Sequence, residues 1–287
     1  MTPAESQSPV PPALPDLLTL IAVSCLAYII EVALHEHGGH ALACVLLNGH
    51  PQEMGAFYVD CDYSRVSTLG VRLVALAGPV VSLLVGLTGF AVLRRLPVTA
   101  TPARYFAWLI GSLGLMSSSG YLLFSGVAGI GDLGTTADGV FYRVEPQWLC
   151  RAGLTAAGAW TYWLVIKHMR QTLLPQPVGA ALAKQARRVT LVSYLSGAIV
   201  YAAIGLLNPH GFAIMAMSVL PSSLGGTCGL LVMWNGFRAS APQTSADPSL
   251  QQGLHQGLDF GRNVVWISVA LAVTIAYAAV FGPTLRP

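Results

Sequence analysis

Residues 17–47 read LLTLIAVSCLAYIIEVALHEHGGHALACVLL, an apolar run in which three histidines and two glutamates gather toward one end. A helix of about 20 apolar residues, rising about 1.5 Å per residue, can cross the hydrocarbon core of a bilayer. Each ionisable side chain at that depth costs at least about 2.5–3.5 kcal/mol on insertion scales, so such groups usually have a function. The stretch therefore predicts a membrane helix that carries a chemical site.

The whole chain has the composition of an integral membrane protein. Of its 287 residues, 54% are hydrophobic and only 9% are charged, whereas soluble domains have about 25% charged residues. We expect an all-α, polytopic bundle of six or seven transmembrane helices. The expected spans are 17–47, 71–93, 105–125, 189–207, 211–234 and 263–283, with a weaker seventh at 149–168.

Cysteine usage and net charge argue against two other classes of protein. The five cysteines are an odd number, and Cys25, Cys44 and Cys228 fall within apolar spans. This argues against a disulfide framework, so we expect small packing residues there. The net charge of +3 is spread over several loops, so no nucleic-acid partner is expected.

The polar cluster has the residue types of a zinc site, because imidazole and carboxylate are zinc ligands. Residues 35–40, HEHGGH, read H-E-x-x-x-H, one residue longer than the H-E-x-x-H zinc motif. In a regular helix His35 and His40 would be about 140° apart. A bulge at the two glycines, which are poor helix formers, would turn both histidines toward one metal and leave Glu36 beside it as a base. Without a bulge, Glu36 or His37 would be a ligand together with His40.

The segments that follow this motif extend the pattern in a fixed order. Residues 41–43 read ALA, residues 57–65 (FYVDCDYSR) alternate as a short strand, and LVALAGPVVSLLVG (73–86) contains Ala77-Gly78-Pro79. Over roughly residues 25–135 the chain resembles the site-2 protease family of intramembrane zinc metalloproteases. In that family a helix of the form HExGHALA is followed by a small β element and by a helix that opens with AGP.

The resemblance implies a Zn²⁺ cofactor with a third ligand, which the family takes from an aspartate on a later helix. The segment LPSSLGG (220–226) has the outline of that motif, but Gly225 stands where the acid would be. The better candidate is Asp132, a lone acid in a glycine-rich stretch directly after an apolar span, and Asp138 is the reserve, as is His37 among the histidines. Irregular backbone at membrane depth is tolerated where it lines a cavity. An N-cap or a loop position is the other interpretation of Asp132.

The function implied by the resemblance is hydrolysis of peptide bonds in transmembrane protein substrates within the lipid bilayer, with Glu36 as general base. The strand at 57–65 would hold an extended substrate by β-addition, or be a plain surface hairpin. The alternative is a non-catalytic relative that binds or escorts membrane segments, because the motif has an extra residue and the expected acid is missing. A di-iron oxygenase would need paired histidines, and the chain has no His-His pair.

Three regions follow from this interpretation. Residues 1–16 form a disordered proline-rich tail, 17–135 a metalloprotease-like membrane core, and 136–287 further transmembrane helices with a polar loop near 239–259.

With seven spans, ten Lys and Arg residues fall on the side of the N-terminus and five on the other side. This favours a cytoplasmic N-terminus and a zinc end that points away from the cytoplasm. Many site-2 proteases point that end toward the cytosol, so either 149–168 is no span or this protein differs.

Overall fold

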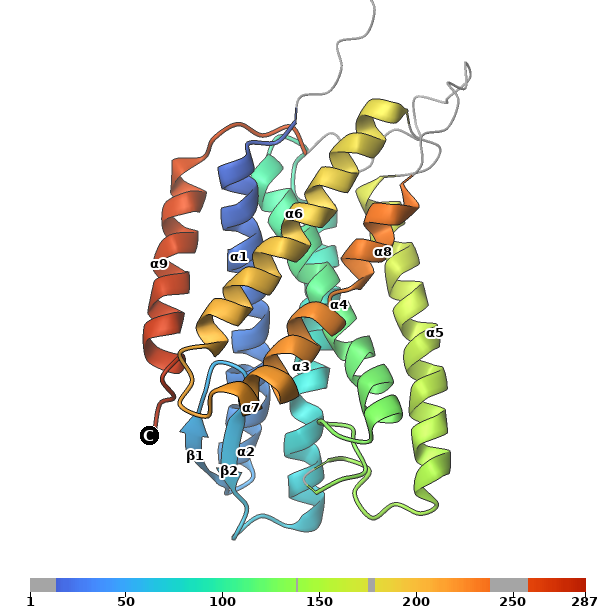
Figure 1. Cartoon of the computed structure of the whole chain (residues 1–287), viewed down its shortest axis with the longest axis vertical. Coiled ribbons are helices and arrows are strands. Elements are labelled where there is room, and N and C mark those ends of the chain that lie inside the picture. Colours follow the sequence, from blue (N-terminus) through green and yellow to red (C-terminus); the bar gives the residue numbers. More distant parts are fainter. Residues whose placement is uncertain (1–13, 138, 175–178, 238–257) are drawn as a thin grey trace, which may run out of the picture.

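Long helices run between the two ends of the molecule, which the computed structural model describes over residues 14–137, 139–174, 179–237 and 258–287 (Figure 1). With η marking π-helical segments, the elements in chain order are α1 (Leu17–Ala33), η1 (Leu34–Ala41), α2 (Leu42–Leu46), β1 (His50–Met54), β2 (Val59–Asp62), α3 (Thr68–Arg95), α4 (Thr101–Ala128), α5 (Gln147–Leu173), α6 (Ala180–Gly205), α7 (Phe212–Ile214), η2 (Met215–Val219), η3 (Pro221–Gly225), α8 (Gly229–Gly236) and α9 (Val264–Phe281).

Six helical stretches are long and apolar enough to cross a membrane. They are Leu17–Leu46, Thr68–Arg95, Thr101–Ala128, Ala180–Gly205, Phe212–Gly236 and Val264–Phe281. The expected helical bundle with a small β element after the first helix is confirmed. The predicted tail and the predicted polar loop lie outside the described residues, except for 14–16 and 258–259.

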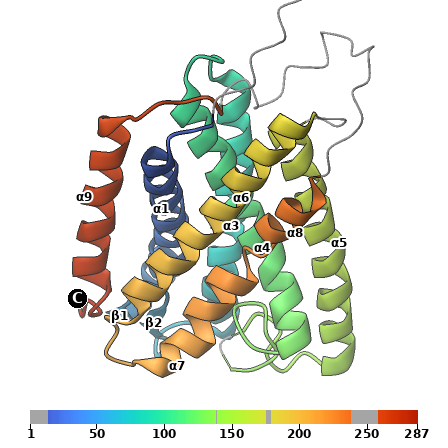
Figure 2. The same ribbon diagram turned by 45° about the horizontal axis from the view of Figure 1, so that its top comes forward.

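The weaker seventh span is also a long helix, α5, which lies along α4 on the side of the bundle opposite α9 (Figures 1 and 2). Helix α6 begins at Ala180, earlier than the expected residue 189. The sequence placed this basic start in a loop, but the Arg187 guanidinium donates to the carbonyl of Phe237, 2.7 Å away. This contact helps helix α6 to extend beyond its apolar part, because it binds one of the charged groups to neighbouring backbone.

The helices alternate in direction, so the connections divide between two ends. The β hairpin, the loop after α4, helix α7 and the C-terminus lie at one end, which we call the hairpin end (Figure 1). The starts of α1, α4, α6 and α9 lie at the other end. Residues 31–42 lie in the half of the bundle next to the hairpin end, as α1 continues into η1 and α2 there.

Small and polar side chains hold the helices together, as is usual in apolar bundles. Helices α3 and α4 touch backbone to backbone: a Cβ on Gly89 would lie 2.6 Å from the Cα of Gly111. Away from the hairpin end, the Tyr105 hydroxyl joins three helices, because it lies 2.7 Å from Ser24 Oγ and 2.6 Å from Ser193 Oγ. These contacts fix α1, α3, α4 and α6 relative to one another.

The two strands form an antiparallel hairpin in which Met54 pairs with Val59 and His50 with Asp62. The outer edge of β1 is closed at Met54, which exchanges two backbone hydrogen bonds with Leu285. The Glu53 carboxylate joins the hairpin to its neighbours at this end of the molecule. It accepts hydrogen bonds from the side chains of Tyr58, His210 and Arg286. Strand β2 has no second strand partner within the described residues.

The expectation that the cysteines only fill space is wrong for Cys44. It forms a disulfide with Cys61 of β2, with the two Cα atoms 6.2 Å apart. Cys44 lies in α2, just beyond the histidine cluster, and is buried between Val74 of α3 and Cys61 of the hairpin. The bond therefore links the end of the histidine-bearing helix to the strand, whereas Cys25, Cys150 and Cys228 are free.

Candidate metal centre

A π-helical turn brings the two outer histidines of HEHGGH to one side of the helix. Segment η1 spans Leu34–Ala41 within an otherwise α-helical rod. A π turn contains one residue more than an α turn, so residues five apart come close together. The bulge that the extra residue predicted is therefore present, and the ring nitrogens Nε2 of His35 and His40 are 3.2 Å apart.

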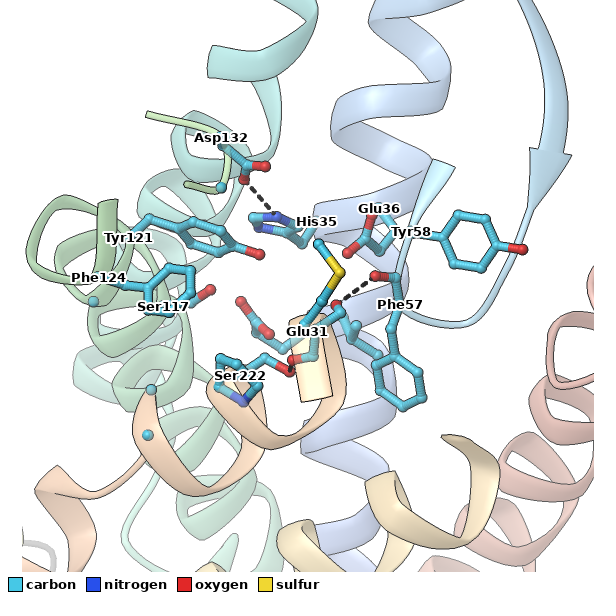
Figure 3. A pocket seen from close by; sticks show the side chains of 18 of the residues that line it. Glu31, His35, Glu36, Phe57, Tyr58, Ser117, Tyr121, Phe124, Asp132 and Ser222 are labelled. Atoms are coloured by element: carbon cyan, nitrogen blue, oxygen red, sulfur yellow. Dashed lines mark hydrogen bonds and ion pairs between the residues drawn. The ribbon is translucent and has the colours of Figure 1, made fainter. Parts of the chain in front are cut away.

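Asp132 completes a triangle with these two nitrogens. Its Oδ2 lies 3.3 Å from His35 Nε2 and 3.3 Å from His40 Nε2 (Figure 3). Oδ2 is buried and has no hydrogen-bond partner of acceptable geometry. One proton can bridge only two of the three atoms, whereas a metal ion contacts all of them, so the group His35, His40 and Asp132 is a possible metal site.

The other nitrogen of each ring fixes which nitrogen carries the proton. His40 Nδ1 lies 2.8 Å from the carbonyl oxygen of Val74, which can only accept, so Nδ1 is protonated. His35 Nδ1 lies 2.9 Å from Ser82 Oγ, and that hydroxyl donates to Glu31 Oε1 at 2.8 Å. In its neutral form, each ring therefore presents an unprotonated Nε2 to the centre, as metal binding requires.

Helix α3 explains the AGP triplet, because it packs directly against η1. A Cβ on Gly39 would lie 2.7 Å from the Cα of Gly78, and a Cβ on Gly78 would collide with Nε2 of both His35 and His40. The N–H that Pro79 lacks would have bonded the carbonyl of Ala75, and the carbonyl of Val74, one residue earlier, accepts from His40. The glycine makes room for the rings, and the turn before the proline holds one of them.

Asp132 reaches the centre from the loop after α4. Helix α4 ends at Gly129, and both Gly129 (φ 78°) and Gly131 (φ 83°) adopt the left-handed conformation that glycine allows. The loop is held by its own backbone, with the Asp132 carbonyl accepting from Val140.

Glu36 lies next to the triangle and faces the same cavity (Figure 3). Only 5% of its surface is exposed, and it makes no hydrogen bond or ion pair with other described residues. The cavity has a volume of about 780 Å³, and its lining includes residues of η1, α4, β2 and the η2–η3 segment. A buried carboxylate without a partner, beside a possible metal site, can take part in proton transfer.

The remaining predicted positions lie elsewhere. The His37 ring stacks on Phe281 of α9, with centroids 4.0 Å apart, so it points away from the triangle. Asp138 lies outside the described residues. Gly225, where the acid of the family motif would be, lies in η3 and lines the cavity.

Sequence reasoning missed Ser82, Glu31 as its partner, and Tyr121, whose ring stacks on His35 at 4.9 Å. A signal for Ser82 was present, because it lies four residues after Gly78 and therefore on the same face of α3. Tyr121 has no comparable signal, since its position depends on how α4 packs against η1.

Loss of a ligand should remove bound metal. We expect His35→Ala and His40→Ala to lower metal content from about one ion per chain to near zero, because two protein ligands rarely retain a zinc-like ion. His37→Ala should leave metal content unchanged, because its ring packs on Phe281. Elemental analysis of the purified, folded variants measures this, and loss of metal in His37→Ala alone would contradict the geometry.

The small residue at 78 should be essential for the same site. Gly78→Ala places a methyl group against both ring nitrogens, so metal affinity should fall by at least about tenfold, the scale of other disturbances around metal ligands. Gly153→Ala on α5 is the matched control, because a Cβ there meets no atom within 4 Å. Equal metal affinity in both variants, measured by titration, would show that the rings do not depend on α3.

No protein-family model, curated protein or solved structure matches this chain. The resemblance to site-2 proteases therefore rests on the motif at 35–40, the hairpin and the AGP triplet. Any function for the chain has to be argued from the side chains that meet in the cavity.

Proposed function

We propose that this chain is an intramembrane metallohydrolase of the site-2 protease type, which cleaves peptide bonds of transmembrane substrates. The observation that carries the proposal is the convergence of His35, His40 and Asp132 beside Glu36 in one cavity. The altered motif, which favoured a non-catalytic relative, has a physical explanation: η1 absorbs the extra residue. Asp132 supplies the acid that Gly225 lacks.

The size of the triangle favours zinc. Nitrogen or oxygen ligands placed tetrahedrally about 2.0–2.1 Å from Zn²⁺ lie about 3.3–3.4 Å from one another. The three distances here are 3.2, 3.3 and 3.3 Å. Two imidazoles and one carboxylate are also a common ligand set of catalytic zinc sites.

His35, His40 and Asp132 would hold the zinc ion, which would supply a water whose pKa is lowered to about 7. Glu36 is the group that accepts the proton as the water attacks the peptide carbonyl. Its carboxylate makes no hydrogen bond or ion pair among the described residues and faces the cavity, so it can later pass this proton to the departing amine. Burial keeps competing water away from the carboxylate.

The hairpin offers a place for an extended substrate beside Glu36. Strand β2 lines the cavity through Val59, and neighbouring Phe57 and Tyr63 line it as well. The edge of β1 is closed by Leu285, whereas the outer edge of β2 has no strand partner within the described residues. A substrate segment that pairs with this edge would be unwound from its helix, which exposes its carbonyl groups to attack.

The hairpin end, with the metal centre, would face a non-cytoplasmic compartment. Of the described Lys and Arg residues, five lie at this end and nine at the other: Arg65, Arg72, Arg143, Arg151 and Arg286 against Arg94, Arg95, Arg104, Lys167, Arg170, Lys184, Arg187, Arg188 and Arg262. Basic residues favour the cytoplasmic side. The Cys44–Cys61 disulfide gives independent support, because disulfides persist in oxidising compartments and are rare in the cytosol.

Replacing the proposed base tests catalysis separately from metal binding. Glu36→Gln keeps the size of the side chain but cannot accept a proton, and general base catalysis is worth about 10²–10⁴-fold. Cleavage of a panel of tagged single-span membrane proteins should therefore fall by that order, while metal content stays at the wild-type level. Undiminished cleavage would remove Glu36 as base, and loss of metal would make it a ligand. A wild-type chain that binds metal but cleaves nothing would favour the escort function.

The orientation can be tested with single cysteines at the two ends. Thr99 and Gln147 are both exposed, at the opposite end and at the hairpin end respectively. In a chain whose three free cysteines are replaced by alanine, Gln147→Cys should react with a membrane-impermeant maleimide in intact cells, whereas Thr99→Cys should react only after lysis. The inverse pattern would place the metal centre at the cytosolic face.

A further inference from the structure

Glu31 is a buried acid that the proposed reaction does not use. It lies on α1 four residues before His35, only 7% of its surface is exposed, and it forms no ion pair with Lys or Arg among the described residues. A carboxylate in an apolar interior is costly unless hydrogen bonds or nearby cations compensate for lost hydration. Its surroundings should therefore show what stabilises it.

A chain of two hydrogen bonds connects Glu31 to the metal centre. Ser82 Oγ lies 2.8 Å from Glu31 Oε1 and 2.9 Å from His35 Nδ1. A serine hydroxyl has one hydrogen to donate. The carboxylate is the strongest acceptor in reach, because among the described residues Ser82 Oγ has one further hydrogen-bond contact, to Ser117 Oγ, and it is longer at 3.4 Å. The hydroxyl therefore donates to Glu31 and accepts from the N–H of His35.

We propose that Glu31 is a positioning residue of the metal centre, acting on His35 through Ser82. The relay orients the His35 ring, keeps its proton on Nδ1, and places a negative charge behind the ligand, which makes Nε2 a better donor to a metal. Carboxylates that accept from metal-bound histidines commonly do this directly. Here the serine extends the connection by one bond. The inference rests on the proposed metal site.

The two histidines are supported differently. His40 donates to a neutral backbone carbonyl, that of Val74, whereas His35 is linked to a side-chain charge. Only the support of His35 can therefore be weakened by a side-chain substitution outside the ligands. Ser82 is the informative residue, because it is fully buried (0% exposed) and does not line the cavity. Glu31 does line the cavity, so a substitution of Glu31 alone could also alter contacts with a substrate.

The test measures metal binding to the purified full-length chain without any substrate. Glu31→Gln removes the charge with little change of shape, and Ser82→Ala removes the connecting hydroxyl. Each should weaken Zn²⁺ binding by about 10–100-fold. The double variant should bind no more weakly than Ser82→Ala, because Glu31 acts only through the serine. The visible absorption bands of bound Co²⁺ should shift in both single variants, which reports a changed ligand field and not merely a less stable fold.

A matched control is Ser112→Ala on α4. Ser112 is also fully buried and donates only to a carbonyl of its own helix, that of Trp108, so Zn²⁺ affinity and the Co²⁺ spectrum should stay at wild-type values. If His35→Ala abolishes binding but Glu31→Gln and Ser82→Ala bind normally, the relay is wrong and the metal site stands. If His35→Ala binds metal like the wild type, the proposed function fails. A further loss in the double variant would show that Glu31 acts by another route.

Discussion

The contact between Gly39 and Gly78 is the constraint on which the metal centre depends. Backbone meets backbone there, since a Cβ on Gly39 would lie 2.7 Å from the Cα of Gly78. This approach lets both histidine rings lie over Gly78 and lets the Val74 carbonyl accept from His40. Any side chain at the contact would separate the helix that carries the histidines from the one that orients them. The two glycines act through their lack of a side chain, which lets the helix backbones approach closely, as small residues commonly do between membrane helices.

The polar groups of the centre compensate for one another's burial. Ser82 donates to Glu31, the Val74 carbonyl accepts from His40, and Asp132 faces both rings. An isolated charge buried in such an apolar interior is costly unless it is paired or hydrogen-bonded. The groups can therefore be buried together, and removal of one would leave its partners buried without a hydrogen bond or opposite charge. This interdependence explains why the polar cluster occurs as a block in an otherwise apolar helix.

The features that could be predicted from the sequence are those that depend on residues close together in the chain. Long apolar runs marked the helices, and the spacing of HEHGGH with its paired glycines indicated the π turn now seen in η1. Asp132 stood out because a lone acid in a glycine-rich stretch has few structural explanations. Ser82 did not stand out, because serine is common in membrane helices and its partners lie 47 and 51 residues away along the chain. The Cys44–Cys61 disulfide was missed for a related reason. Cys44 belongs to an apolar run, and only the fold shows that the end of this helix packs against β2.

The walls of the cavity differ in how firmly they are held. The hairpin is joined to the histidine-bearing helix by a disulfide, to the C-terminus by the Met54–Leu285 bridge, and to other segments by Glu53. The facing wall, η2–η3, contains two π segments and a proline, and Ser218 gives it a side-chain hydrogen bond to the hairpin at the carbonyl of Phe57. Covalent attachment fixes β2 relative to Glu36, because Cys44 follows Glu36 by two helical turns. A substrate strand paired with β2 in the proposed reaction would therefore meet the base in a fixed register, and adjustment to different side chains would fall to the η2–η3 wall.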